Sequence, residues 1–206
     1  MWSYEKRLQF PVNIKEPNAK LAQVIISQFG GPDGELSASM RYLSQRYSMP
    51  YREVAGLLTD IGTEELAHME MISAIVHQLT RDLSMEEIEK SGFATYYVDH
   101  TVGVWPTAAA GIPFNACEFQ VKGDPVTDLT EDLAAEQKAR ATYENILRLI
   151  REPDVCEPIK FLRAREIVHF QRFGEALRIT QDKLDNRNFY AFNPAFDRCE
   201  DCGCDK

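Results

Sequence analysis

Hydrophobic residues recur every three to four positions over most of this chain, which is the spacing of amphipathic helices. Asn18 is suited to cap the first of these segments, which Gly30-Gly31-Pro32 interrupts, and Pro32 suits the first turn of a renewed helix. The pattern predicts helices over residues 18–29, 32–47, 50–81, 126–151 and 156–184. With the first two segments taken as one interrupted helix, the chain contains four long helices.

A different pattern covers residues 93–125, where six glycines and prolines occur and no helical period persists. We expect a long crossover connection with one or two short strands, preceded by a short helix that a capping box at Ser84–Glu87 opens. Two long helices before this crossover and two after it predict an all-α, ferritin-like four-helix bundle. Residues 1–185, including an extended N-terminal arm, are predicted to form this domain, and residues 186–206 an irregular tail.

Charge and composition narrow the range of partners. A net charge of -9 argues against nucleic acid, because phosphate binding needs a basic face. No apolar run approaches the ~20 residues of a membrane span, and the N-terminus lacks the apolar stretch of a signal peptide. We therefore expect a cytoplasmic protein with no nucleic-acid or membrane partner.

The cysteines do not form the framework of a secreted protein, because their number, five, is odd. Three of them, Cys199, Cys202 and Cys204, lie in the predicted tail. Thiols so close together can bind a soft metal or cross-link chains, and a tail without function is an equally good interpretation.

Two Glu-x-x-His segments carry the chemistry that the pattern indicates: Glu65 with His68, and Glu166 with His169. At a spacing of three, a carboxylate and an imidazole project from one face of a helix, one turn apart, and can hold one ion. A single segment of this kind is weak evidence, because surface salt bridges use the same spacing.

The two segments belong to two matching halves of the chain. Glu35 and Glu136 each precede their Glu-x-x-His segment by 30 residues, so the halves correspond at an offset of 101. At the same offset Tyr42 corresponds to Tyr143. One glutamate from each of two helices and Glu-x-x-His from each of two others form the pattern of a carboxylate-bridged dimetal site. Two cations would neutralise acids that are costly to bury alone.

With these residues the sequence resembles the non-haem manganese catalases, and most closely the spore coat proteins of the CotJC type. The resemblance covers about residues 1–185 and rests on the stretches Gly30–Glu35, Asp60–His68, Ala134–Arg140 and Arg165–His169. It implies an enzyme that disproportionates hydrogen peroxide to water and oxygen with two manganese ions per subunit.

The resemblance also implies which side chains hold the two ions. Each ion would take one glutamate and one histidine, and a fifth ligand would bridge the pair. The implied ligands are Glu35 and His68 for one ion, Glu136 and His169 for the other, and Glu65 as the bridge. Carboxylates and imidazoles suit manganese, and they suit iron as well.

Glu166 and Tyr42 are the implied catalytic residues. Glu166 would order a water at the metals and move protons, and Tyr42 would hydrogen-bond to the site. Some family members carry a basic side chain directly before the fourth ligand, where this chain has Ala135. This departure bears on the rate of peroxide turnover. Glu64 and Glu70, beside the ligand face, are expected to be salt-bridge or solvent groups, and His77 and His100 are not expected to be ligands.

Two other functions use the same residues. A di-iron oxidase or peroxide reductase has the same ligand types, although a rubrerythrin-like reductase would carry two Cys-x-x-Cys pairs, and this chain has one, Cys199 with Cys202. A mainly structural spore coat protein could retain the metal site and use its surface for assembly. The family resemblance further implies a homo-oligomer, with a hexamer as the expectation, which is deposited in the spore coat beside other coat proteins.

Overall fold

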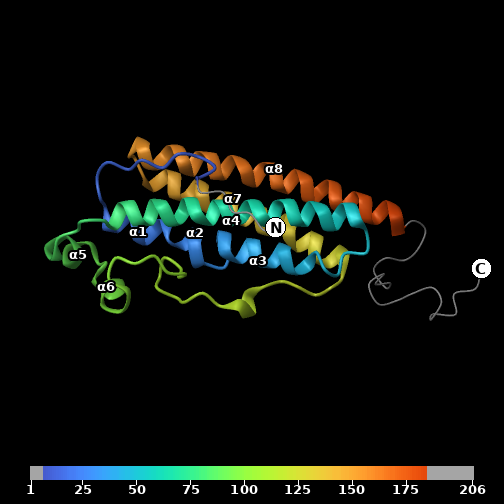
Figure 1. Ribbon diagram of the computed structural model, residues 1–206, viewed down its shortest axis with the longest axis horizontal. Coiled ribbons are helices and arrows are strands. Elements are labelled where there is room, and N and C mark those ends of the chain that lie inside the picture. Colours follow the sequence, from blue (N-terminus) through green and yellow to red (C-terminus); the bar gives the residue numbers. More distant parts are fainter. Residues whose placement is uncertain (1–6, 185–206) are drawn as a thin grey trace, which may run out of the picture.

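Long helices that run side by side form the protein (Figure 1). The computed structural model describes residues 7–184. An interrupted first helix is followed by the three other long helices, α4 (Arg52–Thr80), α7 (Pro125–Leu149) and α8 (Pro153–Leu184). The predicted all-α, ferritin-like four-helix bundle, with its long crossover between the second and third long helices, is confirmed.

Three segments that all pack on α4 form the first long helix: α1 (Ala19–Ile25), α2 (Ser27–Gly30) and α3 (Glu35–Gln45). The predicted helix start at Pro32 is wrong, because α3 begins at Glu35. The break has a steric cause at Gly30, where a Cβ atom would lie 2.2 Å from the backbone nitrogen of Thr107. The crossover therefore packs directly against the bend, and only glycine fits there.

Two apolar clusters fill the bundle, one on each side of a polar layer. One cluster contains Ile61 of α4 and Phe173 of α8. The other contains Ile72 of α4 and Leu162 of α8. An amphipathic helix keeps one face toward the core. The polar residues between these positions therefore also point inward, and they are held from both sides by close-packed side chains.

The crossover contains three short helices, α5 (Met85–Ser91), α6 (Ala94–His100) and the 3-10 turn η1 (Ala116–Glu118). The predicted capping box is confirmed, because Ser84 and Glu87 bond to each other's backbone N–H. The predicted strands are wrong: within residues 7–184 the only β-pairing is an isolated bridge between Thr107 and Pro113. From α6 the crossover runs along the bundle to α7 (Figure 1). Turns within the crossover and side chains of the bundle satisfy its backbone, as where the Ala108 N–H donates to the Ile112 carbonyl at 2.9 Å and Gln45 Nε2 donates to the carbonyl of Gln120 at 2.9 Å.

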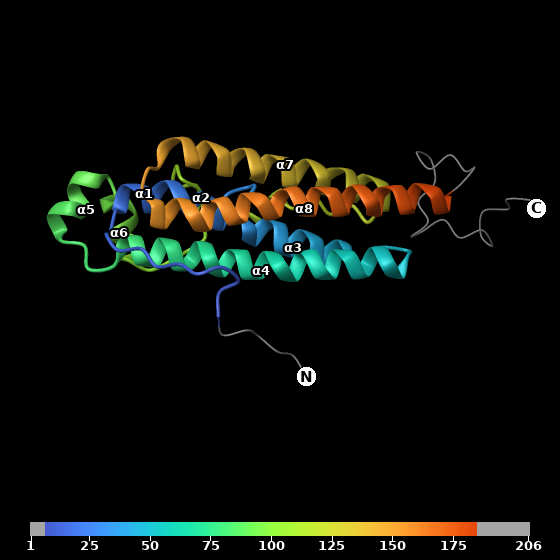
Figure 2. The ribbon, with the colours of Figure 1, turned by 90° about the horizontal axis from the view of Figure 1, so that it is seen from above.

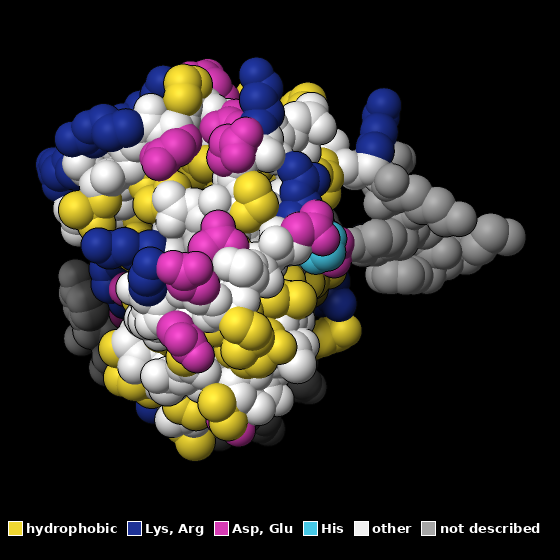
Figure 3. Space-filling model, turned by 90° about the vertical axis from the view of Figure 1, so that its left-hand side faces the viewer, with side chains coloured by type: hydrophobic (Ala, Val, Ile, Leu, Met, Phe, Trp, Pro, Cys, Tyr) yellow, Lys and Arg dark blue, Asp and Glu magenta, His cyan; other side chains and the backbone are white. Residues whose placement is uncertain are grey.

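The surface at the α5–α6 end mixes acidic, basic and hydrophobic side chains (Figure 3). Within the described part of the chain, none of the helices combines the length and hydrophobicity that crossing a membrane requires.

The N-terminal arm lies along α4 and α8 (Figure 2). The Ile14 N–H donates to the Gln78 side chain at 2.7 Å, and the Lys15 N–H donates to Asp154 at 2.8 Å, so the arm bonds to both helices. The predicted tail at 186–206 and its cysteines lie outside the described residues, and the domain boundary at 185 stays a prediction.

Candidate metal centre

Six titratable side chains meet in the polar layer between the two apolar clusters, and each is at most 2% exposed. Three come from the α3–α4 hairpin and three from the α7–α8 hairpin: Glu35, Glu65, His68, Glu136, Glu166 and His169. The helix period accounts for this meeting, because a spacing of three places each Glu-x-x-His pair on one buried face. The structure brings together all five predicted ligands and Glu166; that they bind metal stays a prediction.

Glu65 lies between the two histidines. Its Oε2 is 2.6 Å from Nδ1 of His68, and its Oε1 is 2.7 Å from Nδ1 of His169. The same ring nitrogens lie 3.7 Å from Glu35 and 3.6 Å from Glu136, and the rings stack with centroids 5.5 Å apart. Each half of the site therefore pairs one histidine with one outer glutamate, and Glu65 joins the halves.

Two tyrosines connect the hairpins crosswise. Tyr42 on α3 donates its hydroxyl hydrogen to Glu136 on α7, and Tyr143 on α7 donates to Glu35 on α3. Burial, followed by the nearby carboxylates, raises the pKa of both hydroxyls well above its usual range, so both stay protonated donors. Tyr143, predicted only to correspond to Tyr42 along the chain, makes the equivalent bond.

An ion pair that was not predicted as part of the site lies behind the histidines. Glu64 Oε2 is 3.0 Å from Nε2 of His169, and Glu64 Oε1 is 3.6 Å from Nε2 of His68. Arg165 donates to the same carboxylate from Nε at 2.7 Å and from Nη2 at 3.1 Å. Glu64 is a salt-bridge group, as expected, and it also holds the imidazole of His169 and lies near that of His68. Glu64 and Arg165 are 101 residues apart, which is the repeat offset. A pair of opposite charges at that offset is therefore the feature of the sequence that could have indicated this ion pair.

Burial dominates the electrostatics of the outer carboxylates. It raises the pKa of Glu35 to about 7, and the charge of Glu65 adds to the effect. Burial likewise raises the pKa of Glu136, and it raises that of Glu166 well above the usual range. Burial also acts to raise the pKa of Glu65, but the charges of the two histidines outweigh it and lower that pKa below its usual range. Burial therefore favours the protonated form of the outer carboxyls, and a cation beside them would favour the ionised form.

The atoms of this site fit a pair of divalent cations. Several buried atoms have no hydrogen-bond partner, among them Glu136 Oε2 and Glu166 Oε1, and Glu65 Oε1 and His169 Nδ1 lie 2.7 Å apart without the geometry of a hydrogen bond. Because buried polar atoms are normally paired, these atoms are candidate ligands. Ligand atoms of Glu65, His68, Glu166 and His169 all lie within 4.8 Å of one another. Four carboxylates and two imidazoles are a donor set for manganese or iron.

A small cavity adjoins the carboxylate side of the site. Its walls include the site residues Glu35, Tyr42, Glu136 and Glu166, and neither histidine lines it. The volume open to the centre of a water-sized molecule is about 10 Å³, which is enough for roughly one water. The site can therefore receive a very small molecule from the side opposite Glu64.

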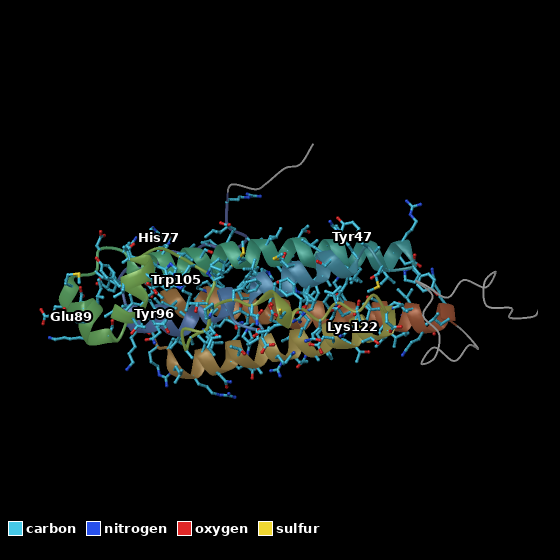
Figure 4. All side chains as sticks on the ribbon, turned by 90° about the horizontal axis from the view of Figure 1, so that it is seen from below. Tyr47, His77, Glu89, Tyr96, Trp105 and Lys122 are labelled. Carbon is cyan, nitrogen blue, oxygen red and sulfur yellow. The ribbon has the colours of Figure 1, made fainter. Side chains whose placement is uncertain are left out.

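The remaining two histidines take no part in the site, as predicted. His77 lies toward the α5–α6 end of the bundle (Figure 4). His100 stacks on Trp105 with ring centroids 4.4 Å apart.

Comparison with known proteins gives consistent matches. Residues 1–192 match the family described as manganese containing catalase. Protein CotJC of Bacillus subtilis is 49% identical over 190 residues, which cover 92% of this chain and 100% of that protein. A probable manganese catalase of Clostridium acetobutylicum is 34% identical and covers 92% of this chain and 85% of its own. The crystal structure of KatB, a manganese catalase from Anabaena, superposes with a TM-score of 0.82 at 32% identity, over 90% of this chain and 83% of that one.

Proposed function

This chain belongs to the manganese-containing catalase family, and on that premise we propose that it disproportionates hydrogen peroxide at a dimanganese centre. One peroxide is oxidised to oxygen with loss of two protons and two electrons, and a second takes up both and becomes two waters. The observation that carries the proposal is the pair of matched half-sites, each with one histidine beside one outer glutamate, joined through Glu65.

Glu35 and His68 would hold one ion and Glu136 and His169 the other, with Glu65 between them, the arrangement that the shortest distances in the site favour. When bound, two manganese ions supply the two-electron oxidation and reduction that peroxide disproportionation requires. The same donor set accepts iron.

Glu166 is the group that we assign to proton transfer. Its carboxyl is 2% exposed, lines the cavity, and has an oxygen without a hydrogen-bond partner. Burial and then the charges of Glu35 and Glu136 hold its pKa well above the usual range, so it can keep a proton beside the substrate. Tyr42 supports this role by donating to Glu136, which fixes that carboxylate.

The cavity favours a small substrate. A space for about one water excludes bulky peroxides, whereas hydrogen peroxide is only slightly larger than the space. We further propose a homo-oligomer, with a hexamer as the expectation, and deposition among other spore coat proteins, which the resemblance to CotJC-type proteins supports.

Replacing Glu65 by Gln tests the proposal. The variant should lose bound manganese and with it oxygen release from peroxide, because the shared carboxylate is gone. Glu70→Gln is the matched control, since Glu70 is on the same helix outside the site. Metal content and oxygen evolution are measured without an added reductant. Full activity of Glu65→Gln would refute the assignment, and peroxide consumption that needs a reductant would favour a di-iron peroxide reductase.

A further inference from the structure

Arg41, on α3, is a buried cation without a bonded partner. It is 2% exposed, and within residues 7–184 its Nε has no hydrogen-bond acceptor and no salt bridge reaches it. A guanidinium stays charged at any physiological pH. Leaving such a group buried and unpaired is costly. Its position therefore suggests a partner that occupies the space beside it.

That space is the small cavity at the metal centre. Arg41 lines it together with Glu35, Glu136 and Glu166. Apart from Asp33 and Tyr42, the remaining lining residues have small side chains, and Ala135 is one of them. Arg41, with its five guanidinium N–H donors, thus lines the same cavity as the carboxyl that we assign to proton transfer.

Asp132, on α7, lies close enough to Arg41 for the charge of the guanidinium to act on its pKa. Its side chain is fully buried, and neither of its oxygens has a hydrogen-bond partner within the described residues. Burial raises the pKa of Asp132 well above its usual range, whereas the Gln45 side chain and then the charge of Arg41 act to lower it. Asp132 is one helical turn before Glu136 and shares its helix face, so it can act as a counter-charge to the guanidinium beside the cavity.

We propose that Arg41 is a substrate-binding residue, which donates hydrogen bonds to an oxygen of the peroxide in the cavity. The inference rests on the proposed function. The chain lacks a basic side chain at position 135, and Arg41 brings a positive charge to the same cavity from the opposite hairpin. Asp132 acts as a positioning residue for Arg41.

The test compares wild type with Arg41→Met/Asp132→Asn, a double variant that removes both charges and leaves neither ion alone. Each protein is loaded with manganese, and azide, a small anion, is titrated by calorimetry. The dissociation constant of azide should rise by about 10- to 100-fold, the effect of one or two charge-assisted hydrogen bonds. The KM for peroxide should rise similarly, with a smaller change in kcat and an unchanged manganese content.

Arg148→Met is the control, because Arg148 is an exposed arginine on α7 outside the cavity. If the double variant does not fold, Arg41→Lys replaces it; this variant retains the charge but not the planar fork, and should weaken azide binding several-fold. Azide affinity equal to wild type in the folded, manganese-loaded variant would overturn the assignment. Weaker azide binding with no oxygen from any protein, wild type included, would support Arg41 and refute the catalase function.

Discussion

Replacing Glu64 by Gln is expected to weaken manganese binding by about 10- to 100-fold while the bundle stays folded. The Glu64 carboxylate accepts from His169 at 3.0 Å and from two nitrogens of Arg165 at 2.7 and 3.1 Å. A glutamine has the same shape but presents an NH2 group to one set of these donors. Groups that orient metal-binding histidines contribute this much to affinity, which corresponds to roughly 1.4–2.8 kcal/mol.

The fold should tolerate the change because Glu64 lies at the margin of the core, with its side chain 16% exposed. The remaining hydrogen bonds of Arg165 can shift to water, so we expect little change in melting temperature for the metal-free protein. The loss should instead appear in manganese affinity, because the Nε2 atom of His169 is no longer held by a carboxylate and the charge near Nε2 of His68 is gone.

The assay is a competition titration of manganese against a chelator, with melting curves of both the metal-free and the loaded protein. Glu70→Gln is the control, because it removes the same charge from the same helix outside the site. Equal manganese affinity in Glu64→Gln and Glu70→Gln would show that the carboxylate behind the histidines does not orient them. A double variant with Arg165→Met should lose little more than Glu64→Gln alone, because the two residues act as one unit.

Three further outcomes are expected. Tyr143→Phe removes the hydrogen bond to Glu35 and should lower manganese affinity by roughly 10-fold in the same titration; unchanged affinity would contradict the crosswise arrangement. Gly30→Ala should lower the free energy of unfolding, measured in urea, by about 1–3 kcal/mol or more, because the new Cβ would lie 2.2 Å from the crossover backbone. Gly56→Ala should raise that free energy by up to about 1 kcal/mol, because nothing lies within 4 Å of the new Cβ. Burial raises the pKa of Glu35 from 4.5 to about 7, so between these pH values the folded metal-free protein holds a proton that the unfolded chain releases. The free energy of unfolding should therefore fall as pH rises from 4.5 to 7, by about 3 kcal/mol for this group. A free energy of unfolding that is flat or rising over that range in urea titrations would contradict the burial of an unneutralised carboxyl.

The helical period and the repeat were sufficient to predict the bundle and the cluster at its centre. The offset that relates Glu35 to Glu136 works because both halves have the same geometry, so residues matched along the chain are also matched in space. Helix ends were less predictable. The first long helix bends at Gly30 because the crossover packs on it, and that contact is made by residues far along the chain.

The supporting residues could not be found in the same way. Glu64 and Arg165 carry opposite charges, so they do not match as identical residues at the repeat offset, although their pairing depends on that difference. Arg41 has no counterpart in the second half, where Thr142 takes its position. Its place beside the cavity follows from how α3 packs on α7, and the chain pattern does not report this packing.

The crossed tyrosine bonds bear on what happens when the chain is divided. A break within the crossover yields two fragments, each with a tyrosine that lacks its acceptor and a glutamate that lacks its donor, because Tyr42 serves Glu136 and Tyr143 serves Glu35. Each fragment keeps the histidine and outer glutamate of its own half-site but lacks the tyrosine that bonds to that glutamate. Complementation of the two fragments, rather than independent folding of either, is then the route by which a nicked molecule regains an intact interior.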